Sequence, residues 1–133
     1  MGKITLILGA NNSGKSKYAE EIINKMEGKR YYIATMIPRN DYNVDKINKH
    51  ILQRKHMNFT TIEEPYNLNQ IDVDKGSVCL LEDVSNLLAN NIFDKKRNWE
   101  EVAEDIRTLS QRCSHLVIVS IDGLEMDKYT GET

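Results

Sequence analysis

The feature that most constrains this chain is an eight-residue segment near its N-terminus, Gly9-Ala10-Asn11-Asn12-Ser13-Gly14-Lys15-Ser16. It fills every fixed position of the phosphate-loop pattern G-x-x-x-x-G-K-[ST]. Glycines let successive backbone N–H groups wrap close to a polyphosphate, and the N-terminus of the following helix adds its dipole. We therefore expect all eight residues to bind nucleotide, with Lys15 reaching the β- and γ-phosphates and Ser16 holding Mg²⁺.

The sequence around this segment has the order that a phosphate loop requires. Residues 4–8 form a short apolar run that is typical of a buried parallel strand. Residues 15–26 carry apolar side chains at helical spacing, and Gly28 stands where such a helix would end. The alternative is a glycine turn without a ligand. This is the weaker interpretation, because so specific a pattern rarely matches by chance.

Composition argues against several other classes of protein. The chain has 133 residues, enough for one domain, and its 18 basic and 20 acidic side chains leave a net charge of −2. This charge balance gives no sign of the basic excess that is typical of nucleic-acid-binding proteins, so we expect no nucleic-acid partner. Two cysteines, Cys79 and Cys113, are too few for a disulfide framework or a zinc site, so we expect reduced thiols in a cytoplasmic protein. Neither a signal-peptide pattern nor a membrane-length apolar run is visible, and we expect no membrane partner.

The rest of the chain alternates strand and helix patterns. Strands are expected at 31–35, 59–63, 78–83 and 116–121, and helices at 45–55 and 99–112, with 87–93 as an apolar helix or turn. Asp45 is the predicted N-cap of the first of these helices, and Asn98 with Glu101 forms a capping box for the second. This alternation predicts a three-layer α/β domain of the P-loop NTPase type with a mostly parallel sheet. Residues 36–44 follow a strand end on the ligand side, so we expect a mobile lip there.

A second informative feature is an apolar strand that ends in two carboxylates. Glu82 and Asp83 follow the apolar residues 78–81 directly. Such a strand can deliver carboxylates to the Mg²⁺ beside a phosphate loop, although many buried strands simply end in an acid at the surface. Together with the phosphate loop, the pattern predicts a metal site made of Ser16, Glu82 and Asp83.

The alternating pattern is lost from Asp122 onward, and the chain finishes on the polar residues 131–133. Five strands are few for a domain of this type. We therefore expect a single domain over residues 1–133 that is truncated at its C-terminus, with residues 122–133 as a poorly ordered tail.

Taken together, these parts resemble the bifunctional adenosylcobinamide kinase/adenosylcobinamide-phosphate guanylyltransferases of cobalamin biosynthesis. The similarity spans most of the chain, from the first strand to about Ser120. It is carried by the phosphate loop followed by Tyr18-Ala19-Glu20, by Tyr32-Ile33-Ala34-Thr35, by Ile47-x-x-His50-x-x-x-Arg54, by Thr61-x-Glu63, by Leu80-Leu81-Glu82, and by Asn90 followed by Phe93.

The resemblance implies a two-step chemistry that uses Mg²⁺ and ATP or GTP. A nucleoside triphosphate first phosphorylates the aminopropanol hydroxyl of adenosylcobinamide, the corrinoid substrate. GTP then transfers GMP to the histidine that matches His50, and the GMP passes to the phosphorylated corrinoid. A homo-oligomer, commonly a trimer, is also implied. The residues that the resemblance places at the site are His50, Lys15 and Glu82 as catalytic residues, and Thr35, Arg54 and Glu63 as nucleotide contacts.

Two other hypotheses stay open beside this one. The chain could be a nucleotide-binding module without turnover, or another small-molecule kinase or NTPase on the same scaffold. Residues 121–124 replace the family's Asn-Glu-Val-Gly segment, and the family's arginine-rich helix and closing strand are absent from the sequence. A neutral imidazole is a competent nucleophile near pH 7. Without the resemblance, however, the pattern would favour a solvated surface histidine at position 50. His56 and His115 match no motif.

Overall fold

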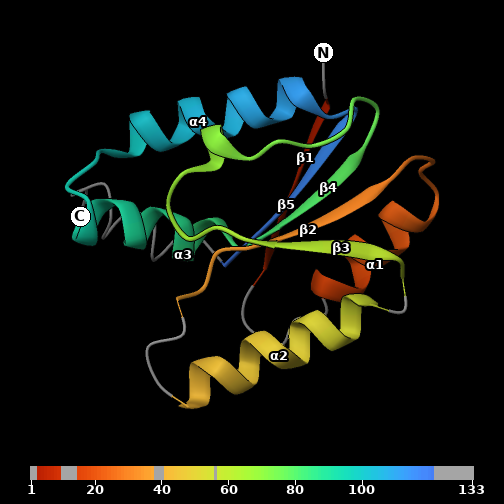
Figure 1. The fold of residues 1–133 in the computed structure, drawn as a ribbon, viewed down its shortest axis with the longest axis horizontal. Coiled ribbons are helices and arrows are strands. Elements are labelled where there is room, and N and C mark those ends of the chain that lie inside the picture. The colour runs from red at the N-terminus through yellow and green to blue at the C-terminus, as the bar shows by residue number, and fades with distance from the viewer. Residues whose placement is uncertain (1–2, 10–14, 38–40, 56, 122–133) are drawn as a thin grey trace.

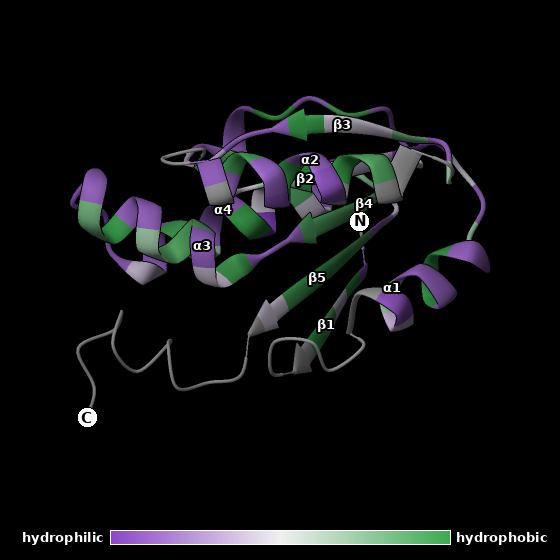
Figure 2. Cartoon of the chain, turned by 90° about the horizontal axis from the view of Figure 1, so that it is seen from below, coloured by the Kyte–Doolittle hydropathy of each residue, from purple (hydrophilic) through white to green (hydrophobic). Residues whose placement is uncertain are grey.

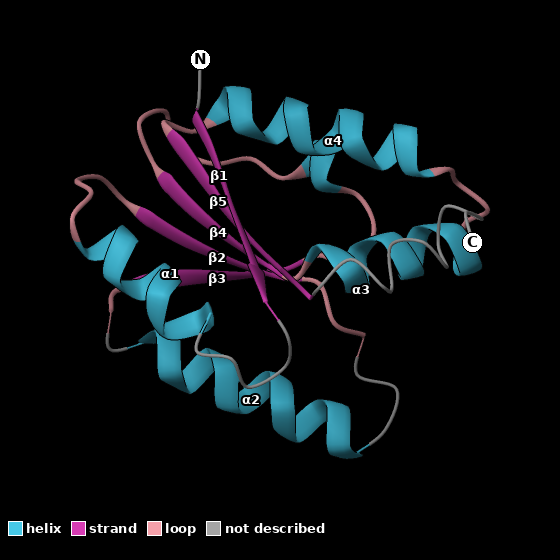
Figure 3. Ribbon diagram, turned by 180° about the vertical axis from the view of Figure 1, so that it is seen from behind, coloured by secondary structure: helices cyan, strands magenta, loops and turns pink. Residues whose placement is uncertain are grey.

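A five-stranded parallel sheet lies between two layers of helices in the computed structural model, which describes residues 3–9, 15–37, 41–55 and 57–121. Helices α1 and α2 cover one face of the sheet, and α3 and α4 cover the other (Figure 1, Figure 3). The elements are β1 (Lys3–Gly9), α1 (Lys15–Asn24), β2 (Arg30–Ala34), α2 (Asp41–Lys55), β3 (Phe59–Glu63), the 3₁₀ turn η1 (Leu68–Gln70), β4 (Val78–Glu82), α3 (Val84–Ala89), the π-helical turn η2 (Asn90–Asp94), α4 (Trp99–Arg112) and β5 (His115–Ile121). The predicted three-layer α/β fold is confirmed.

The strands do not lie in chain order. The sheet runs β1-β5-β4-β2-β3, and every neighbouring pair is parallel. The last of the described strands, β5, is therefore inserted between the strand that leads into the phosphate loop and the strand that ends in Glu82. All five residues of β4 are buried, because this central strand is covered on both faces.

The core consists of two layers, one on each face of the sheet. Strand side chains alternate between the faces, so neighbouring residues of β4 enter different layers. Leu81 packs with α3 and α4, whereas Leu80 packs with α1, and both are fully buried. Figure 2 shows the apolar residues concentrated on the strands and on the helix faces turned toward them. The apolar runs seen in the sequence therefore form the centre of the molecule.

Local sequence signals predict one helix boundary correctly and a second one to within two residues. α4 begins after Asn98, whose side chain accepts a hydrogen bond from the Glu101 backbone N–H at 2.9 Å, while the Asn98 N–H donates to the Glu101 carboxylate at 3.3 Å. The predicted capping box is thus confirmed. α1 ends at Asn24, two residues before the predicted end of the helical pattern. Gly28 follows with φ +120°, where a Cβ would lie 2.5 Å from the Gly76 carbonyl oxygen. Only glycine fits this turn.

The predicted start of α2 is wrong. The helix begins at Asp41, so Asp45 lies inside it and is not its N-cap. Asp41 occupies the first turn, where a negative charge stabilises the helix dipole, and Asn43 ties that turn to the Ile37 carbonyl oxygen at 3.3 Å. The predicted lip over 36–44 is correspondingly wrong for 41–44, which are helical, while 38–40 lie outside the described residues.

The region after β4 also differs from the prediction. A helix or turn was expected over 87–93, but α3 already begins at Val84 and widens into η2 at Asn90. Asp83 is the reason for the early start, because its Oδ1 accepts the Asn86 backbone N–H at 2.7 Å and caps the helix. The expected tail, 122–133, lies outside the described residues.

Both cysteines are free and buried. Hydrogen bonding with Cys113, followed by burial, raises the pKa of the Cys79 thiol, which keeps it protonated and unreactive at neutral pH. None of the helices in the described ranges combines the length and the apolar composition needed to cross a membrane.

Candidate functional site at the carboxyl edge of the sheet

The carboxyl ends of the five strands meet at one edge of the sheet because all the strands are parallel. Ligands of open α/β sheets bind at this edge. β1 ends there at Gly9, β3 at Glu63 and β4 at Glu82. Ala34, the last residue of β2, pairs with both Glu63 and Glu82, so these three residues stand in one row across the sheet. The edge thus gathers several residues that are far apart in the sequence.

The carboxylate strand and the phosphate-loop strand are separated by β5. Glu82 pairs with Val119, which in turn pairs with Ile7, two residues before Gly9. Two strand spacings place the β1 and β4 backbones about 10 Å apart at this row. Mg²⁺ commonly keeps several of its waters in proteins, so a carboxylate at this separation can act on the ion through water.

Glu82 enters the core layer that faces α1. It lies two residues after Leu80 and therefore on the same face of β4, and it is only 8% exposed. The hydroxyl of Tyr32, itself 1% exposed, donates a hydrogen bond to Glu82 Oε1 at 2.7 Å. Glu82 is therefore not an acid that merely ends a strand at the surface. It is a buried carboxylate that accepts a hydrogen bond from a buried tyrosine, at the edge where a ligand is expected.

Thr35 links the ends of β2 and β4. Its hydroxyl accepts the Asp83 backbone N–H at 3.0 Å and donates to the Asp83 carbonyl oxygen at 2.8 Å, with the Glu82 carbonyl oxygen at 3.2 Å. The Thr35 backbone N–H donates to the same Glu82 oxygen at 3.2 Å. Thr35 is completely buried, and its hydroxyl bonds to the backbone of Glu82 and Asp83 inside the protein. The nucleotide contact predicted for Thr35 and the metal contact predicted for Asp83, which caps α3, both stay predictions.

Asn90 extends this link to the segment after β3. Its Nδ2 donates to the Thr35 carbonyl oxygen at 2.8 Å and to the Pro65 carbonyl oxygen at 3.0 Å. The next residue, Asn91, donates to the Tyr66 carbonyl oxygen at 3.1 Å, and the Tyr66 hydroxyl donates to Asp94 at 2.8 Å. η2 thus holds the 65–66 segment against the end of β2. Asn90 belonged to a sequence motif, but its contacts were not foreseeable from it.

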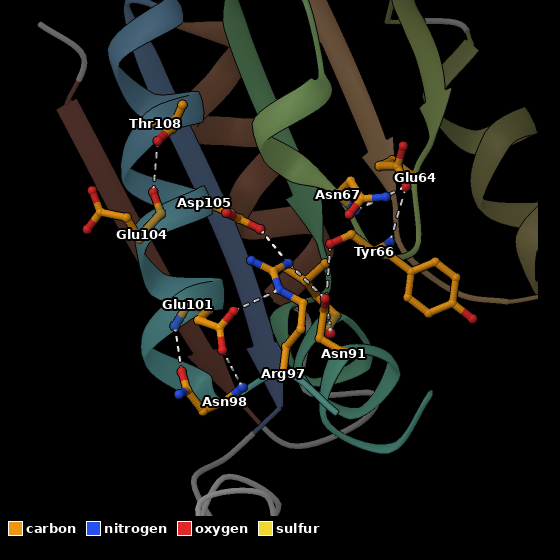
Figure 4. Close-up of polar contacts among 11 residues, drawn as sticks. Glu64, Tyr66, Asn67, Asn91, Arg97, Asn98, Glu101, Glu104, Asp105 and Thr108 are labelled. Atoms are coloured by element: carbon orange, nitrogen blue, oxygen red, sulfur yellow. Dashed lines mark hydrogen bonds and ion pairs between the residues drawn. The ribbon is translucent and has the colours of Figure 1, made fainter. Parts of the chain in front are cut away.

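Arg97 forms a polar link between α4 and η2. Its guanidinium donates to Asn91 Oδ1 at 3.0 Å and to the carboxylate of Asp105 at 2.8 Å (Figure 4). Asp105 is 6% exposed, and its burial is compensated by this ion pair. α4 is therefore connected through Arg97 to η2 and the carboxyl edge.

The remaining predicted site residues are placed through their backbone alone. Lys15 and Ser16 open α1, directly after residues 10–14, which lie outside the described residues. His50 and Arg54 belong to α2, which covers the same face of the sheet as α1 (Figure 3). Glu63 is exposed at the end of β3. The roles assigned to these residues and to Ala10, Asn11, Asn12, Ser13 and Gly14 stay predictions.

The chemistry of the candidate metal ligands fits Mg²⁺. Oxygen atoms are the hard ligands that this ion prefers, and the carboxylates of Glu82 and Asp83 would supply them from the end of β4. Within the part of the chain that the structure describes, no group of three or more His, Cys, Asp or Glu side chains could hold a metal ion by itself. A phosphate-loop site does not need such a group, because nucleotide phosphates and water complete the coordination.

Comparison with known proteins identifies the family. The CobU family model, described as cobinamide kinase / cobinamide phosphate guanyltransferase, matches residues 5–126. This range runs from β1 past the end of β5 and contains the carboxyl-edge residues described above. A search of curated proteins gave no match. The chain belongs to the CobU family of cobinamide kinases and cobinamide phosphate guanyltransferases.

Proposed function

We propose that this chain phosphorylates adenosylcobinamide and transfers GMP from GTP to the resulting adenosylcobinamide phosphate, through a guanylylated His50. The observation that carries the proposal is the carboxyl edge itself: in a chain of the CobU family, the strand leading into the phosphate loop and the strand carrying the buried carboxylate of Glu82 end at this edge with one strand between them. Nucleotide substrates and two free thiols are consistent with a cytoplasmic enzyme. The homo-oligomeric state stays a prediction.

In the kinase step, the phosphate loop binds the triphosphate and the corrinoid hydroxyl attacks its γ-phosphorus. The bond between the γ-phosphorus and the bridging oxygen breaks, and the nucleoside diphosphate leaves. Lys15 would offset negative charge on the β- and γ-phosphates. Mg²⁺, held by Ser16 and Glu82 with Asp83 nearby, would supply further charge neutralisation when bound. These residues account for positioning and electrostatics, which are the main needs of phosphoryl transfer.

In the guanylyl-transfer step, a neutral His50 imidazole nitrogen attacks the α-phosphorus of GTP. A nitrogen–phosphorus bond forms and pyrophosphate leaves. A phosphate oxygen of the phosphorylated corrinoid then attacks the same phosphorus, which breaks the nitrogen–phosphorus bond and returns the imidazole. Arg54 follows His50 by one helical turn on α2, where its charge could stabilise the transferring phosphate.

The test is intact-protein mass spectrometry after incubation with GTP and Mg²⁺. We expect a GMP adduct on the wild type that is lost in acid, as a phosphoramidate should be, and that is absent from His50→Ala. His115→Gln is the matched control and should be modified like the wild type, because His115 lies at the start of β5, at the opposite edge of the sheet. GTP binding without an adduct would favour the non-catalytic module, and ATP turnover without an adduct would favour another kinase on this scaffold.

A further inference from the structure

We propose that Tyr32 and Thr35 are positioning residues that hold Glu82 in place for the nucleotide and its Mg²⁺. The inference rests on the proposed function in one respect, since it takes Glu82 as the carboxylate of the phosphate-loop site. Neither residue is required to touch substrate. Both act through hydrogen bonds from β2 to the end of the neighbouring strand β4.

The burial of Tyr32 is the first argument. Its side chain is 1% exposed and belongs to the hydrophobic cluster that packs on α1, and its ring packs edge-on against Phe59 with centroids 6.3 Å apart. A phenylalanine would fill this space equally well. A buried hydroxyl needs a partner, and Tyr32 has Glu82 Oε1 at 2.7 Å. The hydroxyl is therefore explained by what it does to Glu82 rather than by packing.

The register of the two strands makes this contact possible. Tyr32 pairs with Leu80, and Glu82 lies two residues after Leu80 on the same face of β4. A tyrosine side chain leaning along its strand spans this offset. Because one carboxylate oxygen is held by Tyr32, the plane of the planar carboxylate is constrained and so is the direction of the other oxygen. A carboxylate entering an apolar layer would otherwise gain from turning toward water.

Thr35 controls the backbone that carries the same carboxylate. Its hydroxyl and its N–H together contact the carbonyl oxygens of Glu82 and Asp83 and the Asp83 N–H. Asn90 holds Thr35 in turn through the Thr35 carbonyl oxygen. The side chain of Glu82 is thus fixed by Tyr32, and its backbone by Thr35. This division explains why two hydroxyl residues stand three apart at the end of β2.

A double-mutant cycle tests whether Tyr32 acts through Glu82. The variants are Tyr32→Phe, Glu82→Gln and the two combined, and the measurement is the calorimetric Kd of GTP with and without Mg²⁺. In the wild type, Mg²⁺ should tighten GTP binding. We call the ratio of the Kd without Mg²⁺ to the Kd with Mg²⁺ the Mg²⁺ gain. Losing a residue that orients a metal ligand typically weakens metal affinity by about tenfold or more, so Tyr32→Phe should reduce the Mg²⁺ gain by about that factor. In the Glu82→Gln background, the same change should have less than about a twofold effect.

Tyr31→Phe is the matched control. Tyr31 lies on the same strand and is also buried, but its side chain is on the opposite face, where Lys29 lies 5.2 Å from the ring centroid. It should leave the Mg²⁺ gain unchanged. Thr35→Val removes the second hydroxyl and should also reduce the gain, while Thr35→Ser keeps the hydroxyl and should restore it. Thermal unfolding of every variant separates a loss of fold from a loss of positioning.

Several results would overturn the inference. One is a Mg²⁺ gain in Tyr32→Phe within about twofold of the wild type, and another is an equal loss in the presence and absence of the Glu82→Gln change. A wild type that binds no GTP with Mg²⁺ would overturn both this inference and the proposed function. A wild type that binds GTP but forms no adduct on His50 would overturn the proposed guanylyl transfer alone, and the cycle would still decide the role of Tyr32.

Discussion

Several buried polar side chains of this molecule have hydrogen-bond partners on other elements of the fold. Glu82 accepts from Tyr32, Asp105 from Arg97, and the completely buried Asn91 donates to two backbone carbonyl oxygens. Burying a polar group without a hydrogen bond costs a few kcal/mol, so these partners decide whether the buried positions are tolerable.

The His115 side chain provides a residue-scale prediction. Burial, and secondarily the charge of Lys3, lowers the pKa of His115 below its ordinary 6.5. Its Nε2 lies 2.6 Å from Thr5 Oγ1. Well above pH 6.5 the ring is deprotonated in both the folded and the unfolded chain, so His115 adds no pH dependence to the free energy of unfolding there. As the pH falls below 6.5, the unfolded chain takes up the proton first and the free energy of unfolding decreases.

The measurement is the urea midpoint of the wild type and of His115→Gln at about pH 7.5 and about pH 5.5. The wild type should lose more stability between these values than the variant, which has no group titrating at this position. Equal losses in the two proteins would show that His115 is not the source. The size of the effect should be modest because the ring is only partly buried.

Among the elements, α4 shows how a helix is tied to the functional edge. Its N-terminus is capped by Asn98, and its C-terminal Arg112 donates to the carbonyl oxygens of Asn69 and Ile71 at 2.6 and 2.8 Å. Between these ends, Asp105 meets Arg97, which also contacts η2. The helix therefore packs on the sheet and also braces the turn that carries Asn90 and Asn91.

Arg97→Met gives an element-scale prediction. The change keeps an aliphatic stem but leaves the Asp105 carboxylate buried without its cation. Unpairing a buried charge is strongly destabilising, and since Arg97 itself is partly exposed we expect a loss of about 1–3 kcal/mol in the free energy of unfolding. Lys96→Met, an exposed neighbour, should change it by less than about 0.5 kcal/mol. Chemical denaturation measures both, and similar values for the two would refute the bracing role.

At the scale of the whole molecule, stability depends on two apolar layers that share one sheet. Leu81 and Leu80 belong to different layers, and both side chains are fully buried. Leu81→Ala and Leu80→Ala should each cost about 2–5 kcal/mol, a large part of the 5–15 kcal/mol that is usual for a domain. Leu6→Ala is the control, because Leu6 is 55% exposed on the edge strand β1.

Denaturant titration of these three variants tests whether both layers contribute to one cooperative unit. We expect single transitions throughout and a cost for Leu6→Ala well below that of either core change. If only one of the two core variants were destabilised, the two faces of the sheet would not contribute comparably to stability.

Much of this protein follows from its sequence alone, because the signals involved are local. The phosphate-loop pattern spans adjacent residues, the capping box joins Asn98 to Glu101, and the alternation of apolar runs marks strands such as Phe59–Glu63 at their observed bounds. Local signals also mislead when two candidates compete, as Asp45 did with Asp41. The residues proposed to bind nucleotide and to carry GMP come from such local motifs and from the family that they indicate.

The tertiary structure alone decided which distant segments became neighbours. The insertion of β5 between β1 and β4 sets the separation of the phosphate-loop strand from Glu82, and nothing local encodes it. Likewise, Tyr32 and Glu82 lie fifty residues apart in the chain, and only the register of β2 against β4 brings the hydroxyl to the carboxylate. Such pairs form because strand order and burial are satisfied by the whole sheet at once, and a buried polar group must take whichever partner that packing delivers.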